Sequence, residues 1–286
     1  MAEFDYVIVG AGSSGSVLAN RLSADPTVRV CLIEAGPEDR SPFIKIPLGL
    51  IWLSKDRRHN WLFRSTPQKG LDGREVSIPR GKVLGGSSSI NGMIYIRGHR
   101  QDYDDWASAG CTGWDYASVL PYFKKSEANA DPSKSSEFHG RDGPLSVQNL
   151  NDANAMDHVF VDAATQLQHR ACDDFNAPDP EGVGIYQVTQ KDGRRHSTGA
   201  AFLAPVRARA NLHVITGAEV HQVIVRDDRA AGVHLATAQG PQFVEARHEV
   251  ILCAGAIGSP DILLRSGIGD GAALQALDKD VVQHLP

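Results

Sequence analysis

The sequence predicts an α/β fold built around a parallel β-sheet. Tyr6–Val9 is a short, mostly β-branched apolar run of the kind that forms a buried parallel strand, and a glycine cluster and a helical pattern follow it. A second apolar run, VRVCLIEAG at residues 28–36, comes after the helical pattern. This alternation of strand, helix and strand is typical of doubly wound sheets.

The composition is that of an ordinary globular protein. A chain of 286 residues with 42% hydrophobic and 22% charged residues can bury one large core or two smaller ones. Its net charge of -5 argues against a general nucleic-acid binder, so we predict no nucleic-acid partner. No apolar run approaches the length of a membrane span. The N-terminus enters a strand without the pattern of a secretion signal, and we therefore expect a cytoplasmic protein.

The first glycine cluster has the spacing of a dinucleotide-binding turn. Gly10, Gly12 and Gly15 form a G-x-G-x-x-G pattern between the first strand and the helix. The first glycine permits the tight turn, the second lets the backbone approach a pyrophosphate, and the third lets the helix pack closely on the strand. The helix N-terminus then presents free N–H groups and a positive dipole end to the phosphates.

An acidic residue stands where a ribose is expected. Glu34 ends the second strand, and an acid at this place accepts hydrogen bonds from ribose hydroxyls and disfavours a 2′-phosphate. Strand, helix, second strand and acid together predict a dinucleotide site. The motif alone does not separate NAD from FAD.

Two later segments decide between these cofactors. IPRGKVLGGSSSINGMIYIRG covers residues 78–98, and GAIGSPDILLRSGIG covers residues 255–269. They resemble the two signatures of the glucose–methanol–choline (GMC) oxidoreductases, FAD-dependent alcohol-oxidising flavoproteins, and stand in that family's order. The resemblance runs over essentially the whole chain and is closest to bacterial aliphatic-alcohol and choline dehydrogenases. An NAD-dependent dehydrogenase would leave both segments unexplained.

The resemblance implies a Rossmann-like FAD-binding domain and part of a second, sheet-containing substrate-binding domain. The first is expected from residues 1–150 and 196–286, as a discontinuous and incomplete domain, and the second from residues 151–195. Within the second, residues 157–176 look helical and residues 182–190 look like a strand. The polar run 126–145 is expected to be a mobile or lid-like loop, and residues 99–110 to cap one side of the flavin.

The glycines of the second cluster have a chemical use. A flat, wide isoalloxazine ring admits backbone only where side chains are missing, and Gly85 and Gly86 supply such backbone. The hydroxyls of Ser87–Ser89 can satisfy phosphate or flavin oxygens. The family resemblance adds Val83 and the backbone of Asn91, Gly92, Met93 and Ile94. Apolar residues among the glycines argue against a flexible linker.

The third flavin-facing segment is the end of a strand. Val250–Cys253 reads as a buried strand, followed by small residues that can pass close to the cofactor. Ser259 and Pro260 are expected to open a helix as N-cap and first residue. The resemblance places the Val220 backbone near the adenine. The expected cofactor contacts are therefore Gly10, Gly12, Ser13, Ser14, Gly15, Glu34, Ala35, Val83, Gly85, Gly86, Ser87, Asn91, Gly92, Met93, Ile94, Val220, Ala254 and Gly255.

The attachment of FAD is expected to be non-covalent. Some family members bind FAD through a histidine just before the asparagine of the second cluster, and here that residue is Ile90. An isoleucine offers no nucleophile for such a bond.

No catalytic or metal-binding residue can be named. The family's catalytic histidine and its partner lie beyond residue 286, and the chain alone is expected to be inactive. Histidines in polar or strand-edge contexts are usually structural or solvated, which applies to His99, His139, His196 and His221. Widely spaced cysteines form neither a metal pair nor a disulfide framework, as is true of Cys31, Cys111, Cys172 and Cys253.

The expected function is oxidation of an alcohol to an aldehyde or ketone by hydride transfer to FAD. Electrons would pass to a quinone-type or other acceptor, and oxygen stays open as that acceptor. The alternatives are a hydroxynitrile lyase-like protein that keeps FAD without redox use, and a non-catalytic FAD-binding fragment. Similar aliphatic-alcohol enzymes associate with the inner membrane, but nothing in the sequence indicates a membrane-binding surface.

Overall fold

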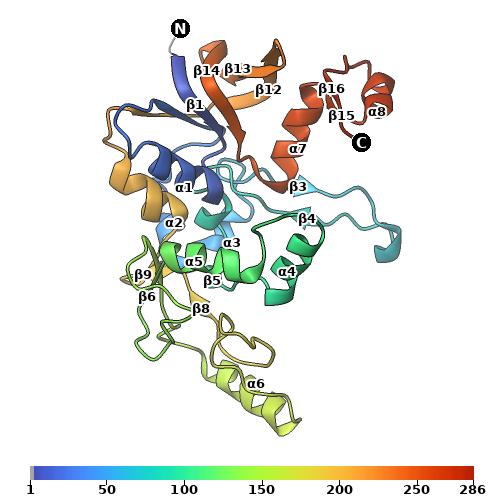
Figure 1. The fold of residues 1–286 in the computed structure, drawn as a ribbon. Coiled ribbons are helices and arrows are strands. Elements are labelled where there is room, and N and C mark those ends of the chain that lie inside the picture. The colour runs from blue at the N-terminus through green and yellow to red at the C-terminus, as the bar shows by residue number, and fades with distance from the viewer. Residues whose placement is uncertain (1–2) are drawn as a thin grey trace. The chain divides into compact units, whose positions relative to one another are not determined.

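The computed structural model describes residues 3–286 (Figure 1). The chain forms two compact units. The first comprises Met1–Asn91 and Ser197–Pro286, and the second comprises Gly92–His196. The chain re-enters the first unit at Ser197, next to the expected boundary at 196, but the contacts of residues 92–150 assign them to the second unit. The assignment of the two expected domains to cofactor and substrate stays a prediction.

A six-stranded sheet is the centre of the first unit. Its strand order is β11-β2-β1-β14-β13-β12. Neighbouring strands are parallel from β11 to β14 and antiparallel from β14 to β12. The expected α/β class with a parallel sheet is therefore confirmed. The strands are β1 (Glu3–Val9), β2 (Val30–Glu34), β11 (Leu212–Thr216), β12 (Glu219–Arg226), β13 (Arg229–Thr237) and β14 (Gly240–Leu252).

The apolar residues of β1 and β2 explain why these strands lie in the middle. Successive side chains of a strand point to opposite faces. Val7 packs in one buried cluster and Ile8 in another, so both faces of the sheet are covered. Helix α1 (Ser13–Leu22) contributes Ala19 to the cluster of Ile8, and α7 (Gly255–Arg265) contributes Ile262 to the other.

Short elements complete the first unit. Two-residue strands pair outside the main sheet, β3 (Phe63–Arg64) with β4 (Ser77–Ile78) and β15 (Ile268–Gly269) with β16 (Gln283–His284). The helical elements are α2 (Pro42–Lys45), η1 (Pro47–Gly49), α3 (Leu50–Leu53), η2 (Lys69–Leu71), η3 (Gly86–Ser89), η4 (Gly199–Leu203), η5 (Ala204–Val206) and α8 (Gly271–Ala276).

The second unit is held by short strand pairs and three helices. Strand β5 (Ile94–Tyr95) pairs with β8 (Gln187–Val188), β6 (Glu127–Asn129) with β7 (Leu145–Val147), and β9 (Gln190–Lys191) with β10 (Arg194–Arg195). The helices are α4 (Arg100–Ser108), α5 (Tyr116–Ser126) and α6 (Ala155–Gln166).

Two expectations for the second unit need correction. The helix expected over 157–176 ends at Gln166, because Gln168 takes a left-handed backbone conformation with φ of 66° that a helix cannot continue. The strand expected over 182–190 is confined to Gln187–Val188, with a separate pair beginning at Gln190.

The loop between β6 and β7 is anchored rather than free. His139, near its middle, is 2% exposed and lies between two carboxylates, with its Nδ1 2.9 Å from Glu127 and its Nε2 3.0 Å from Asp174. Arg97 binds the second oxygen of Glu127 at 2.7 Å. This buried ion network argues against the expected mobile lid.

Candidate functional site

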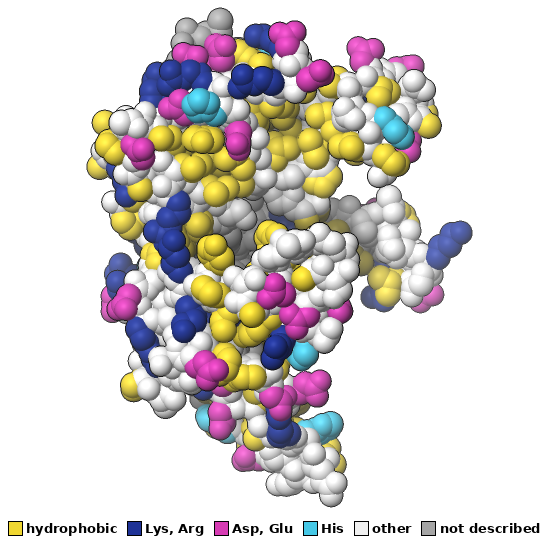
Figure 2. Space-filling view, viewed as in Figure 1, with side chains coloured by type: hydrophobic (Ala, Val, Ile, Leu, Met, Phe, Trp, Pro, Cys, Tyr) yellow, Lys and Arg dark blue, Asp and Glu magenta, His cyan; other side chains and the backbone are white. Residues whose placement is uncertain are grey.

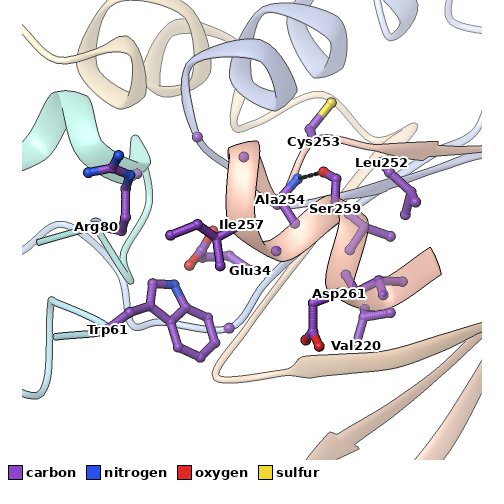
Figure 3. A pocket seen from close by; sticks show the side chains of 18 of the residues that line it. Glu34, Trp61, Arg80, Val220, Leu252, Cys253, Ala254, Ile257, Ser259 and Asp261 are labelled. Carbon is purple, nitrogen blue, oxygen red and sulfur yellow. Dashed lines mark hydrogen bonds between the residues drawn. The ribbon is translucent and has the colours of Figure 1, made fainter. Parts of the chain in front are cut away.

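A cavity of about 710 Å³ lies in the first unit where the parallel strands end (Figure 3). Its wall includes Val9, Glu34 and Leu252, the last residues of β1, β2 and β14. Ligands of open α/β sheets bind beyond the carboxyl ends of their strands. The cavity therefore stands where the fold class expects a ligand.

The turn after β1 is shaped by its glycines. Gly10 has a φ of 98°, and a Cβ there would lie 2.5 Å from the Cys253 carbonyl oxygen. A Cβ on Gly15 would lie 1.9 Å from the Gly10 oxygen, so this glycine sets the close packing of α1 on the turn. Gly12 differs, because a Cβ there would meet no heavy atom closer than 4.0 Å. Gly12 faces the cavity.

The N-terminus of α1 opens onto the same space. Gly12 is the N-cap and provides no side chain to bind the first N–H groups, and the first helical residues Ser13 and Ser14 line the cavity. Uncapped N–H groups and the positive end of the helix dipole favour an anion at this place.

The second glycine cluster meets the first directly. A Cβ on Gly86 would lie 2.7 Å from the Gly12 Cα, although 74 positions separate the two residues in the sequence. Gly86 has a φ of 54°, which disfavours any residue with a side chain. Gly86 and Ser87 line the cavity beside α1.

The third segment begins α7 earlier than expected. The helix starts at Gly255 and not at Ser259–Pro260, so Pro260 lies inside it. Gly255 has a φ of 81°, which lets the chain turn directly from β14 into the helix. The Ser259 hydroxyl accepts the Ala254 N–H at 3.1 Å (Figure 3) and thereby satisfies the donor that precedes the helix. Residues 254–259 all line the cavity.

Glu34 is 5% exposed and has a donor on each carboxylate oxygen. The Ala11 N–H donates to Oε2 and the Gly36 N–H to Oε1, both at 2.9 Å. Burial raises the pKa of Glu34 to about 7, and these two bonds and the charge of Lys82 only partly offset it. The carboxylate thus fixes both flanking turns while it lines the cavity.

The opposite wall holds residues that the sequence reasoning did not assign. The rings of Trp61 and Phe63 are parallel within 5°, with centroids 5.7 Å apart, and Lys82 Nζ lies 4.2 Å from the Trp61 ring centroid. Arg80 supplies a positive charge to this wall (Figure 3). Elsewhere on the cavity wall, the charged residues Glu219, Asp261 and Arg265 were also unassigned, and the last two form an ion pair at 2.8 Å.

Asn60 joins the two segments that form this wall. It is 2% exposed, and its side-chain oxygen accepts the N–H groups of Leu62 and Arg80, both at 3.0 Å. A buried amide that holds two separate segments explains why Trp61 and Arg80 lie together. The structure alone shows that Asn60 has this role.

Most of the expected contact residues share the cavity wall. These are Gly10, Gly12, Ser13, Ser14, Glu34, Ala35, Gly86, Ser87, Val220, Ala254 and Gly255. Gly15, Val83 and Gly85 lie behind the wall. Gly15 packs against Gly10, Val83 is fully buried in a small apolar cluster, and Gly85 has a positive φ and packs near the Ser89 hydroxyl.

The remaining expected contacts lie where the chain passes from the first unit to the second. Asn91 ends the first unit, while Gly92, Met93 and Ile94 belong to the second. In the second unit Met93 is buried with a φ of 63°, and Ile94 is 54% exposed in β5.

The histidines named from the sequence are either exposed or hydrogen-bonded within the fold. His99 caps α4, and His196 accepts the Ser146 N–H at 3.0 Å, while His221 is exposed on β12. No histidine is among the residues that line the cavity. Over residues 3–286 no group of three or more His, Cys, Asp or Glu side chains could hold a metal ion. Cys31, Cys111, Cys172 and Cys253 are free thiols.

The helices of the described residues were compared with the length and hydropathy that a membrane span requires. Within residues 3–286, none is both long and apolar enough to cross a bilayer.

The cavity fits a dinucleotide. Three segments of bare backbone, an uncapped helix N-terminus and a buried acid are the donor and acceptor set that a pyrophosphate and a ribose require. The volume is in the usual range for a pocket that takes a small organic ligand.

Comparison with known proteins agrees with this geometry. The family model for GMC oxidoreductases matches residues 4–285. An alcohol dehydrogenase [acceptor] from Pseudomonas putida is 47% identical over 285 residues, which cover 99% of this chain and 51% of that protein. An oxygen-dependent choline dehydrogenase from Photobacterium profundum is 42% identical, with 99% and 50% covered. The chain spans about half the length of the curated relatives it matches.

Solved structures match over the same extent. Pyridoxine 4-oxidase from Mesorbium loti has a TM-score of 0.92 and 35% identity, over 99% of this chain and 55% of that one. An FAD-dependent oxidoreductase from Chaetomium thermophilum has a TM-score of 0.92 and 34% identity, with 99% and 51% covered. A formate oxidase from Aspergillus oryzae, described for the modification of its FAD, has a TM-score of 0.90 and 26% identity, with 99% and 50% covered.

Proposed function

Because the chain belongs to the GMC oxidoreductase family, we propose that its cavity binds FAD for the oxidation of an alcohol to an aldehyde or ketone. The observation that carries the proposal is the convergence of Gly12, Gly86 and Gly255 on one cavity wall. Segments so distant in sequence share a wall of bare backbone when one ligand needs close approach from several sides.

The pyrophosphate belongs at the first two glycine clusters. The N–H groups at the start of α1 and the backbone beside Gly86 offer donors, and Ser87 adds a hydroxyl. Arg80 supplies positive charge from the facing wall. Together these groups would replace the water that solvates the phosphates.

The ribose and adenine belong at the other end of the wall. Glu34 keeps further lone pairs on its oxygens after accepting one backbone bond each, so it can also accept a ribose hydroxyl. Val220, at the start of β12, lines the cavity and can offer its backbone to the adenine edge.

Bound FAD would supply the acceptor for a hydride from the alcohol carbon. The chain's own residues hold and orient the cofactor and exclude water from its phosphates. Since no histidine lines the cavity, we assign no residue of this chain as the base that takes the hydroxyl proton. We propose that the base which takes the hydroxyl proton is a residue outside 3–286.

We further propose that FAD binds without a covalent bond and that a quinone-type compound accepts its electrons. Ile90, which precedes Asn91, is 8% exposed and has no nucleophilic atom. The names of two relatives point to different acceptors, an unspecified acceptor in one and oxygen in the other. Reduction of a soluble quinone by substrate, measured with and without oxygen, separates these acceptors in a chain of the relatives' full length.

The proposal is tested by replacing Gly12 with valine. Gly12 has a φ of -71° and open space at its Cβ position, so the fold accepts a side chain there while the pyrophosphate does not. We expect Gly12→Val to lose FAD affinity at least about 100-fold, as judged by flavin absorbance and titration, with an unchanged melting temperature of the apoprotein.

A matched control and a mass measurement complete this test. Gly70→Ala places a methyl group where no heavy atom lies within 4 Å, at a residue that does not line the cavity, and should leave FAD affinity unchanged. Denatured wild-type protein should show its unmodified mass, which checks non-covalent attachment. Full FAD affinity in Gly12→Val would refute the proposed site.

A further inference from the structure

The last turns of α7 carry two charged side chains on the cavity wall of the first unit. Asp261 and Arg265 are four residues apart, and Nη2 of the arginine lies 2.8 Å from Oδ2 of the aspartate. On the face that Figure 2 shows, charged side chains commonly lie beside hydrophobic ones, so such a pair is by itself an ordinary helix contact. What distinguishes this pair is its place on the wall of the proposed FAD site.

Helix α7 runs along the cavity from its first residue to its last turn. Gly255 begins the helix just after Cys253, whose carbonyl group lies against Gly10 of the first glycine cluster. Arg265 ends the helix about 15 Å further along its axis. A dinucleotide with its pyrophosphate at the glycine clusters therefore extends its base toward the end of α7.

Strand β12 meets the end of α7 at the place proposed for the adenine. The Val223 N–H donates to the Ser266 hydroxyl at 2.8 Å, and Ile262 belongs to the same buried cluster as Val220. Figure 3 shows Asp261 on the part of α7 that lies next to Val220, and both residues line the cavity. The aspartate is therefore at the base end of the cavity.

The lining at this end is largely apolar. Ala218, Val220 and Ile262 line the cavity and belong to one buried cluster. Apolar side chains suit the flat faces of a purine, but the edge of the ring needs hydrogen-bond partners. The polar groups at this end therefore decide which base fits.

Asp261 offers a free acceptor here. Its Oδ2 is paired with Arg265, while its Oδ1 has no hydrogen-bond partner among residues 3–286. The neighbouring carboxylate of Glu219 already has Lys82 Nζ at 3.9 Å. A carboxylate oxygen accepts hydrogen bonds and cannot donate them. The aspartate therefore complements a group that donates, such as an exocyclic amine, and repels a carbonyl oxygen.

We propose that Asp261 selects a 6-aminopurine in the cavity by accepting a hydrogen bond from its exocyclic amine. Adenine carries this amine, whereas hypoxanthine has an oxygen at the same position, which would face the carboxylate without a proton between them. The inference rests on the proposed FAD site and names a specificity-determining residue within it. Any contact from the Val220 backbone to the base is retained when the side chain at 261 is changed.

The test compares the binding of ADP and inosine diphosphate (IDP) to the purified apoprotein by isothermal titration calorimetry. The two nucleotides share their ribose and diphosphate and differ only in the base. We expect wild type to bind ADP about tenfold or more tightly than IDP. Asp261→Asn should reduce this ratio at least about fivefold, mainly through tighter IDP binding, since an amide can donate to the base oxygen as well as accept.

Two comparison variants separate recognition of the base from a structural role. Asp228→Asn makes the same change at an exposed residue that does not line the cavity, and should leave the ratio within about twofold of wild type. Arg265→Gln breaks the ion pair but keeps the acceptor, so it should retain the preference for ADP. An unchanged ratio in Asp261→Asn, or an equal loss of affinity for both nucleotides, would overturn the inference.

FAD titration of the same proteins separates this inference from the proposed function. A wild-type protein that binds no FAD would refute the proposed function and the inference together. If wild type binds FAD and Asp261→Asn keeps the wild-type ratio of ADP to IDP affinity, the inference alone fails. A changed ratio in Glu219→Gln with none in Asp261→Asn would identify Glu219 as the acceptor and would also overturn it.

Discussion

At the scale of single residues, the carboxylate of Glu34 binds the backbone of two turns and, in the proposed site, a ribose hydroxyl of FAD. Both of its oxygens already accept backbone N–H groups, and the group is almost fully buried. Burial penalises the charged form, which is why the pKa rises from 4.5 to about 7. The site thus has well-oriented acceptor oxygens, and burial destabilises the negative charge that they carry.

The raised pKa of Glu34 makes the stability of the apoprotein depend on pH. Between pH 4.5 and about 7 the folded protein holds a proton that the unfolded chain has released, so this group's contribution to stability declines as the pH rises. Over the whole window the decline is about 3 kcal/mol. Glu34→Gln lacks this titration.

Denaturant unfolding of both proteins across this window checks the prediction. The advantage of wild type over Glu34→Gln should shrink by about 3 kcal/mol between pH 4.5 and 8. A difference that stays constant with pH would show that Glu34 titrates normally in the folded protein.

At the scale of elements, the second unit is joined by a network of four charges. Arg97 follows β5, Glu127 begins β6, and His139 and Asp174 lie in separate loops. Burial lowers the pKa of His139, but hydrogen bonds to Asp174 and Glu127 outweigh it and raise the pKa above 6.5. Burial raises the pKa values of Glu127 and Asp174. Hydrogen bonds from His139 and neighbouring donors outweigh this effect, so both pKa values are lowered.

The signs of these shifts predict a window of maximal stability for the second unit. The contribution of His139 is complete below pH 6.5 and is lost as the pH rises through its raised pKa. The contribution of Glu127 is complete above pH 4.5 and is lost as the pH falls through its lowered pKa. The network should therefore stabilise most between about pH 4.5 and 6.5.

His139→Gln should lower stability by about 3 kcal/mol in that window, since buried Glu127 then keeps only Arg97 as a cationic partner and Asp174 loses its bond to His139. The difference from wild type should narrow on both sides of the window. Unfolding followed by tryptophan fluorescence, to which Trp106 and Trp114 of the second unit contribute, gives the measurement. A loss of the same size at every pH would mean that His139 contributes by packing and not by charge.

The elements also show what the sequence could predict. Strand β1, α1 and β2 follow from apolar periodicity and glycine spacing, and the structure confirms them. The start of α7 could not be predicted in this way. Ser259 and Pro260 have the chemistry of a helix start, but Gly255 turns the chain earlier and the serine hydroxyl bonds back to Ala254. The sequence pattern at Ser259 and Pro260 therefore predicted a helix correctly but placed its first residue too late.

At the scale of the whole molecule, the site depends on contacts between distant segments. Gly12 and Gly86 touch, and no spacing rule connects them, so only the family resemblance suggested that they share a ligand. Trp61 and Arg80 were not assigned because they lie in separate segments, which the buried side chain of Asn60 brings together only in the folded chain. Residues 92–150 join the second unit because Met93 accepts the Thr189 N–H and β5 pairs with β8, which are pairings that local patterns do not reveal.

A ligand held by three segments should protect all three at once. FAD binds the folded protein and not the unfolded chain, so at 100 times its dissociation constant it adds about 2.7 kcal/mol of stability. Amide hydrogen exchange read by mass spectrometry should then slow together in residues 10–15, 81–87 and 253–258, while α6 in the second unit changes little. Protection confined to residues 10–15 would mean that the first glycine cluster binds the cofactor alone. Because the three segments share a wall in the apoprotein, we expect their exchange to respond to the same FAD concentration with one midpoint.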